Sequence, residues 1–159
     1  MSRCYLDTNF LYVHLRSERS EAPGPLEDWR SRVLTEAAVD GGVISALVHD
    51  ELACRLILAW LRDDGVNDPL SAYRADAQAV MRTVRRRLTA TWRAVDSLSL
   101  ELQLTDSAVV EQARSLMTRP GLGPRDSFHA AHALVAGCSV IASADATFDH
   151  VPGLRRLAP

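Results

Sequence analysis

Four carboxylates occur in this chain where a folded protein rarely places ionised groups. Two of them directly follow short, strand-like apolar runs, one lies inside an apolar, helix-like stretch, and one opens another helix-like segment. They are Asp7, Asp145, Glu51 and Asp126, respectively. An ionised carboxylate beside an apolar core costs free energy unless a positive group meets it. The chain contains no lysine, so a divalent cation is the leading candidate for that group.

The chemistry that such acids would support is metal-assisted hydrolysis. If the four converge, they cannot all stay ionised without cations. An all-oxygen site suits Mg²⁺, with Mn²⁺ as a substitute, whereas zinc prefers His and Cys. Such an ion lowers the pKa of a coordinated water and stabilises charge that develops on a phosphodiester. Thr8, Asn9 and Ser143 stand beside the strand-end acids, so we expect them to orient a carboxylate or a water.

Each acid also has a purely structural interpretation. Asp7 could cap the following helix, Asp126 could complement a helix dipole, and Asp145 could hold a turn. Glu51 could pair with an arginine such as Arg55, and the adjacent aspartate at position 50 competes with it for the metal role. The placement of all four at strand ends or on apolar helices favours the metal site.

The histidines near the third acid offer a different set of ligands. Asp126, His129 and His132 have the spacing D-x-x-H-x-x-H, which could form a metal trio on one helix face. Because the first and last members are nearly two turns apart, we favour core or rim positions for the histidines, with His129 able to line the site.

The elements that must position these residues alternate along the chain. The predicted strands are 3–6, 43–45, 101–105, 139–143 and 155–157. The predicted helices are 8–16, 25–40, 46–61, 71–95, 106–117 and one that begins near Pro124. Between the first two helices, residues 17–25 are expected to form a loop. The alternation predicts an α/β fold with a mainly parallel sheet, in which ligands bind at the carboxyl ends of the strands. We expect one domain over 1–159, with a helical hairpin over about 46–95.

Composition favours a globular protein in a reducing compartment. The chain has 159 residues, of which 47% are hydrophobic and 24% charged. No apolar run could span a membrane, and none resembles a signal peptide. The three cysteines lie in apolar segments, so we expect small buried thiols in the cytoplasm.

The basic residues are all arginine, and five of them share one short segment without an acid. They are Arg82, Arg85, Arg86, Arg87 and Arg93. Such a run could be a solvated helix face or a strip that binds the phosphates of RNA. Receiver domains and haloacid-dehalogenase-type phosphatases share the strand-end aspartate, but both need a lysine that this chain lacks.

Three stretches carry a resemblance to a known family. They are YLDTNFLYV near the start, VISALVHDEL in the middle, and PRDSFHAAHALVAGCSVIASADATFDHVPGLRRL near the end. In these the chain resembles PIN-domain ribonucleases, above all the VapC-like toxins of bacterial toxin–antitoxin pairs. The resemblance implies a three-layer α/β/α fold, and it carries the family's acidic quartet onto Asp7, Glu51, Asp126 and Asp145. It also suggests Asp149 as an accessory acid, although that residue could simply hold a turn.

The family further implies an activity and partners. These are Mg²⁺- or Mn²⁺-dependent cleavage of single-stranded RNA that leaves a 5′-phosphate, a homodimer, and neutralisation by a small antitoxin of the VapB type. The match is poorest over about 62–100, which includes the arginine cluster. The alternative function is a non-catalytic PIN-like module that binds RNA or protein.

Overall fold

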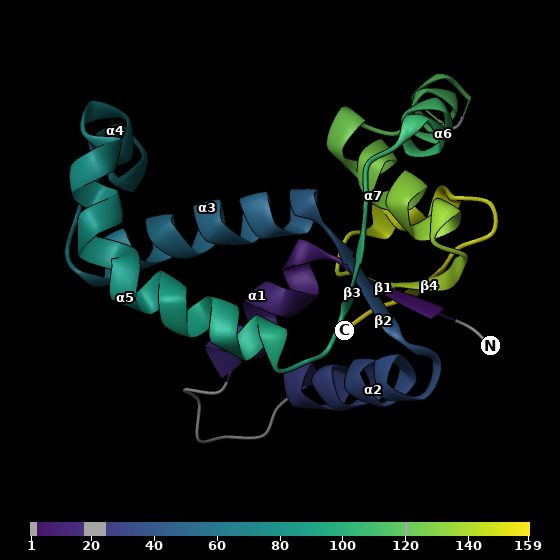
Figure 1. Cartoon of the computed structure of the whole chain (residues 1–159), viewed down its shortest axis with the longest axis horizontal. Coiled ribbons are helices and arrows are strands. Elements are labelled where there is room, and N and C mark those ends of the chain that lie inside the picture. The colour runs from purple at the N-terminus through teal and green to yellow at the C-terminus, as the bar shows by residue number, and fades with distance from the viewer. Residues whose placement is uncertain (1–2, 18–24, 120) are drawn as a thin grey trace.

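The computed structural model of this protein describes residues 3–17, 25–119 and 121–159 (Figure 1). The strands are β1 (Arg3–Leu6), β2 (Gly42–Ser45), β3 (Glu101–Gln103), β4 (Cys138–Ala142) and β5 (Arg155–Leu157). The helices are α1 (Thr8–Ser17), α2 (Pro25–Asp40), α3 (Ala46–Asp63), α4 (Pro69–Ala75), α5 (Ala77–Asp96), α6 (Ser107–Thr118), α7 (Pro124–Val135) and the 3₁₀ helix η1 (Ala146–His150). The predicted α/β class is confirmed. Most of the loop expected at 17–25 lies outside the described residues.

The strands of the described chain form one parallel sheet in the order β3-β2-β1-β4-β5. In the central strand β1, Tyr5 lies opposite Val43 of β2 and Ile141 of β4. The side chains of β1, β2 and β4 are almost all buried, as expected for parallel strands covered on both faces. Because the strands run in one direction, the segments that follow β1, β2 and β4 emerge at the same edge of the sheet.

Helices cover both faces of this sheet, as Figure 1 shows. Helix α2 packs on β1 and β2 from one side, whereas α7 packs on β2 and β4 from the other and is itself covered by α6. Trp29 of α2 is fully buried, and its indole N–H donates to the carbonyl of Leu157 in β5 at 2.8 Å. The predicted three-layer α/β/α arrangement is therefore confirmed.

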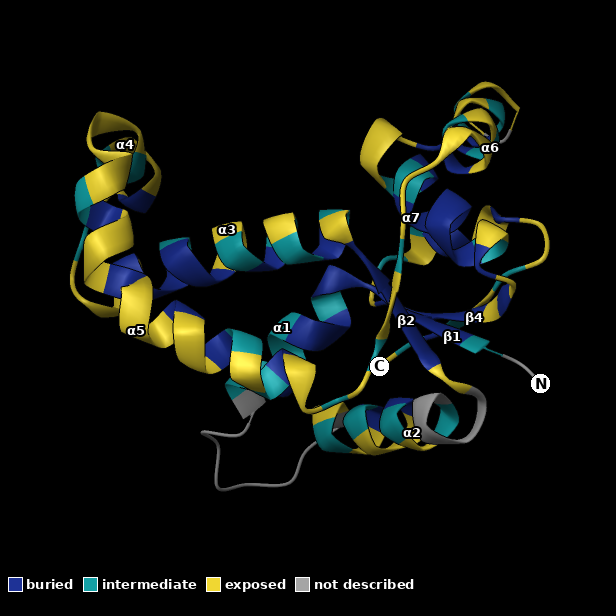
Figure 2. Ribbon diagram, viewed as in Figure 1, coloured by how far each residue is buried: buried dark blue, intermediate teal, exposed yellow. Residues whose placement is uncertain are grey.

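Helices α3 and α5 project from the sheet, with α4 at their far end (Figure 1). The prediction of a single helix over 71–95 was wrong, because the chain breaks at Asp76 between α4 and α5. Asp76 has an extended backbone (φ −151°, ψ 80°), and its carboxylate accepts a hydrogen bond from the amide of Ala79 at 2.8 Å. This cap begins α5 and replaces the helical bonds that a continuous helix would have made. The outward faces of α4 and α5 are exposed (Figure 2).

The cysteines differ from expectation at one position. Cys4 and Cys138 are buried, and burial raises the pKa of their thiols to about 12 and about 11. Cys54 is exposed instead, because it lies on the side of α3 that faces away from the core. Among the helices of the described residues, none combines the length and apolarity that crossing a membrane would require.

Candidate metal centre

The first acid, Asp7, is buried at the carboxyl end of β1, with 3% of its surface exposed. Its Oδ1 accepts a hydrogen bond from the amide of Thr8 at 2.7 Å. Its Oδ2 accepts from Nδ2 of Asn9 at 2.9 Å and from the hydroxyl of Ser143 at 2.6 Å. These donors come from the start of α1 and the end of β4, and they offset the loss of water around a buried charge.

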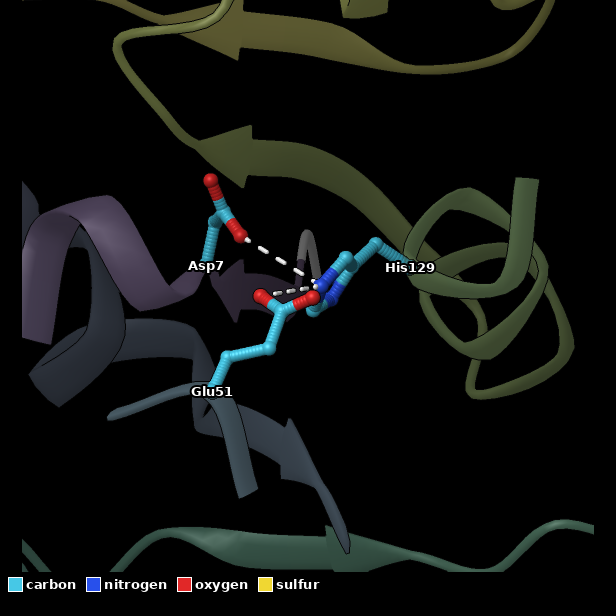
Figure 3. A group of neighbouring side chains, drawn as sticks. All are labelled: Asp7, Glu51 and His129. Carbon is cyan, nitrogen blue, oxygen red and sulfur yellow. Dashed lines mark hydrogen bonds and ion pairs between the residues drawn. The ribbon is translucent and has the colours of Figure 1, made fainter. Parts of the chain in front are cut away.

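The second acid, Glu51, projects from α3 toward Asp7 (Figure 3). Its Oε2 lies 2.9 Å from the Thr8 hydroxyl and 3.1 Å from Nε2 of His129, and its Oε1 lies 3.1 Å from Nη1 of Arg125. Burial raises the pKa of Glu51, but the hydrogen bonds from His129 and Thr8 and the charges of His129 and Arg125 outweigh it, so the pKa is lowered overall. Its neighbour Asp50 is exposed and lines a separate groove.

The ring of His129 points toward both of these acids (Figure 3). From the sequence, His129 was expected either at a core or rim position or lining the site. Its Nε2 is 3.1 Å from Oε2 of Glu51 and 3.8 Å from Oδ1 of Asp7. One ligand atom from each of the three residues lies within 4.8 Å of the others. His132 points elsewhere, with its Nε2 3.2 Å from the hydroxyl of Thr105. The alternative trio of Asp126, His129 and His132 is thus not formed.

The third acid, Asp126, lies in the first turn of α7 and close to the other acids. Burial raises its pKa, and the Asp145 carboxylate raises it further, with Asp7 and Glu51 acting in the same direction. A methyl group added at Gly123, the N-cap of α7, would stand 3.1 Å from Oδ2 of Asp126. The absence of a side chain at that cap therefore leaves room for the carboxylate.

The fourth acid, Asp145, begins η1 after β4. Its Oδ1 accepts from the amide of Thr147 at 2.9 Å, and its own amide donates to Oγ of Ser143 at 3.0 Å. The hydrogen bonds from Thr147 lower the pKa of Asp145, which favours the ionised form. The side chain of Ser143 therefore contacts both Asp7, which follows β1, and Asp145, which follows β4.

Asp149 forms an ion pair with Arg156. Its Oδ1 and Oδ2 lie 2.9 and 2.7 Å from Nε and Nη2 of Arg156, and these hydrogen bonds lower its pKa. The structure therefore places Asp149 in an exposed ion pair on η1, where it supports the connection to β5.

The arginine cluster lies along α5, and one of its members, Arg87, pairs with an acid at the far end of α3. Arg87 forms paired hydrogen bonds with Asp64, at 2.8 and 2.9 Å. Asp64 follows α3, thirteen residues beyond Glu51, which corresponds to about 20 Å along a helix.

Two other arginines flank the acids, and Glu51 pairs with Arg125 where the sequence had suggested Arg55. Arg125 pairs with Glu51, and Nη1 of Arg55 donates to Oδ1 of Asn9 at 2.7 Å. The guanidinium of Arg55 also lies 4.6 Å from the ring centre of Tyr12. Arg55 stands one helical turn after Glu51 on α3, so it lies beside the site although its hydrogen bond goes to Asn9.

The fold and these side chains define a class, an α/β protein whose parallel sheet presents an acid-rich site at its carboxyl edge. A model of the PIN domain family matches residues 4–154, and the chain belongs to that family. PIN domains are generally nucleases, that is, hydrolases that act on nucleic acid.

Solved structures share this fold over nearly the whole chain. The VapBC2 complex of Rickettsia felis bound to a DNA fragment from its promoter contains a chain with 15% identity and a TM-score of 0.58, covering 97% of this chain and 96% of that one. A chain of FitAcB from Neisseria gonorrhoeae has 19% identity and a TM-score of 0.51, with coverage of 96% and 95%. Among curated proteins, none matches this chain.

Proposed function

We propose that this protein is a Mg²⁺- or Mn²⁺-dependent endoribonuclease, acting in the cytoplasm as a toxin that a small VapB-type antitoxin neutralises. The observation that carries the proposal is the meeting of acids from β1, α3 and α7: one ligand atom each of Asp7, Glu51 and His129 lies within 4.8 Å of the others. Asp126 is close enough to the acids for their carboxylates, together with burial, to raise its pKa. Neighbouring acids that resist full ionisation are typical of a site completed by a cation.

The donor set fits a hard divalent cation. Carboxylate oxygens of Asp7, Asp126 and Asp145 would hold the ion, with Glu51 contributing directly or through water. The bound ion supplies Lewis acidity, which makes water more acidic and offsets negative charge on a phosphodiester. The ordered donors around Asp7 keep its carboxylate in a fixed orientation for this task.

Two arginines beside the acids are placed to bind phosphates of the substrate. Arg55, exposed beside Asn9, and Arg125, 70% exposed beside Glu51, stand where a phosphate of the RNA backbone would approach the acids. Farther along, Arg16, Arg86 and Arg87 line a cleft of about 440 Å³ between α1, α3 and α5. We propose that the RNA extends from the acids toward this cleft and the arginine cluster on α5.

A groove next to the site offers a place for the antitoxin. It has a volume of about 340 Å³ and runs from Asp50 and Arg125 across α3 to α4 and α5. Its apolar lining includes Ala53, Ile57 and Met81, the last of which is 40% exposed. An amphipathic segment of a small partner protein would cover these side chains.

The proposal also includes a homodimer, for which sedimentation of the purified chain is the test.

Cleavage assays on matched variants test the proposal. Wild type should cleave single-stranded RNA with Mg²⁺ or Mn²⁺ and stop when EDTA is added, whereas Asp7→Asn and Asp126→Asn should be inactive under all conditions. Asp50→Asn, which removes an exposed acid next to Glu51, is the control and should retain activity. A single-stranded DNA of the same sequence distinguishes a ribonuclease from a general nuclease.

Equal cleavage by wild type and both site variants would rule out the assigned acids. A protein that binds no divalent cation yet binds RNA with a strong dependence on salt would be the non-catalytic module instead.

A further inference from the structure

A buried chain of hydrogen bonds leads from the core of the sheet to Glu51. The hydroxyl of Tyr5 lies 2.7 Å from Oγ of Ser45 and 3.0 Å from Nδ1 of His129. On the other side of its ring, Nε2 of His129 lies 3.1 Å from Oε2 of Glu51. Tyr5 and Ser45 are fully buried and His129 is 2% exposed, so protein groups supply these contacts.

The last hydrogen bond in this chain has a defined direction. Ionised Glu51 can only accept, so Nε2 of His129 must carry the proton and donate. The other ring nitrogen, Nδ1, is held by the Tyr5 hydroxyl at 3.0 Å, so the imidazole is restrained from both sides. Burial raises the pKa of Tyr5, so it remains a phenol that can donate. The Tyr5 oxygen also lies 2.7 Å from Oγ of Ser45, so both contacts restrain its position.

We propose that His129 is a positioning residue, held by Tyr5 and Ser45, that fixes the Glu51 carboxylate opposite Asp7 for the cation. This inference rests on the proposed metal-dependent function and adds a specific role for His129. A glutamate has several rotatable bonds, and outside such restraints its carboxylate would sample many positions. Oε2 is instead held by Thr8 from one side and by His129 from the other.

The same helix contains a matched control. His132 lies one turn after His129 on α7, is 1% exposed, and has its Nε2 3.2 Å from the Thr105 hydroxyl. Replacing it removes a buried histidine and a hydrogen bond without touching Glu51 or Asp7. If metal binding is lost when His129 is replaced but not when His132 is replaced, the loss is due to the position of the site residues and not to general damage to the core.

Binding of Mn²⁺, measured by electron paramagnetic resonance with thermal melting in parallel, tests the proposal. We expect His129→Leu to weaken Mn²⁺ binding by about 10- to 100-fold, the usual effect of removing a group that orients a metal ligand. His129→Gln, whose amide can still donate toward Glu51, should recover part of this loss. Tyr5→Phe should give an intermediate loss, and His132→Leu should bind Mn²⁺ as wild type does.

Other outcomes would overturn the inference in distinguishable ways. Unchanged Mn²⁺ binding by His129→Leu, with wild-type binding intact, overturns the role of His129 alone. If pulsed spectra of the wild type show a nitrogen bonded directly to Mn²⁺, His129 is a metal ligand and not a positioning residue. Absence of Mn²⁺ binding in the wild type overturns the proposed function as well. If His129→Leu does not fold, His129→Gln and Tyr5→Phe decide the question by the same comparison.

Discussion

The hydroxyl of Ser143 donates to Oδ2 of Asp7 at 2.6 Å, although 136 residues separate the two. The same Oγ accepts a hydrogen bond from the amide of Asp145 at 3.0 Å. A single buried side chain at the end of β4 thus fixes the carboxylate that follows β1 and the backbone of the last acid. One hydroxyl group therefore links these two acids.

Removing that hydroxyl should weaken both stability and metal binding. Ser143→Ala leaves the Asp7 carboxylate short of a donor and the Asp145 amide short of an acceptor, which we expect to cost about 1–3 kcal/mol in the free energy of unfolding. Chemical denaturation and a Mn²⁺ titration measure the two effects. Ser127→Ala is the control, because that buried hydroxyl donates to the carbonyl of Leu122 at 3.3 Å and contacts no acid. Equal metal binding by both variants would contradict the bridging role.

Asp126→Asn should stabilise the protein in the absence of metal. The pKa of Asp126 is raised by burial and by neighbouring acids, so its ionised form is unfavourable in the folded state. That cost is complete above the folded pKa and disappears below the unfolded pKa, near 3.8. The variant should therefore melt a few degrees higher than wild type at pH 7–8 in EDTA, and the difference should vanish toward pH 4.

Addition of Mg²⁺ should reverse this order. Binding to the folded state stabilises wild type, whereas the variant lacks a ligand for the ion. A variant that melts below wild type in EDTA at pH 7–8 would show that Asp126 is not destabilised by its neighbours.

Local patterns predicted most of the fold because they depend on near neighbours. The apolar runs before Asp7 and Asp145 specify strands whatever surrounds them, and Pro124 marks a helix start within one turn. Strand order then brings the acids together, since parallel strands share one carboxyl edge. The break at Asp76 was missed because a single capping side chain outweighed an otherwise continuous helical pattern.

The details of the site depend on contacts between distant residues, which no local pattern contains. His129 contacts Glu51 and Tyr5, which lie 78 and 124 residues away in the sequence. The pairing of Arg87 with Asp64 depends in the same way on how α5 packs against the end of α3. Whether the quartet binds a metal remains a prediction for the experiments above.

Gly123→Ala should disturb the site through Asp126 alone. Its new methyl group would stand 3.1 Å from Oδ2 of Asp126, while the backbone at φ −59° accepts an alanine. We expect weaker Mn²⁺ binding with little change in melting temperature. In an Asp126→Ala background, the same substitution should have no further effect on Mn²⁺ binding, and an undiminished effect there would point to a cause other than the carboxylate.

Arg125→Ala should tighten binding of Mn²⁺ while weakening binding of RNA. The arginine is 70% exposed, so its pair with Glu51 contributes little to stability. Its positive charge, 3.1 Å from Glu51, nevertheless opposes a cation at that carboxylate. Calorimetric titration with Mn²⁺ and a KM measurement separate the two effects. Arg119→Ala, on an exposed arginine that follows α6, is the control.

Met81→Glu should impair neutralisation by the antitoxin without impairing cleavage. Met81 is exposed in the apolar groove beside α3, where a buried negative charge would be costly for a bound partner. Co-purification with the antitoxin and RNA cleavage by the free protein provide the two measurements. Leu26→Glu introduces the same charge at an exposed apolar residue of α2 and should preserve both. Intact co-purification by Met81→Glu would exclude this groove.

The position of β1 at the centre of the sheet has a consequence for synthesis on the ribosome. Asp7 is translated 136 residues before its hydrogen-bonding partner Ser143, which follows the neighbouring strand β4. At about 5–20 residues per second, roughly 7–27 s of translation separate the two. An incomplete chain that ends before β4 contains the first three acids but lacks Ser143 and Asp145. The complete site can therefore assemble only after β4, Ser143 and Asp145 have been translated.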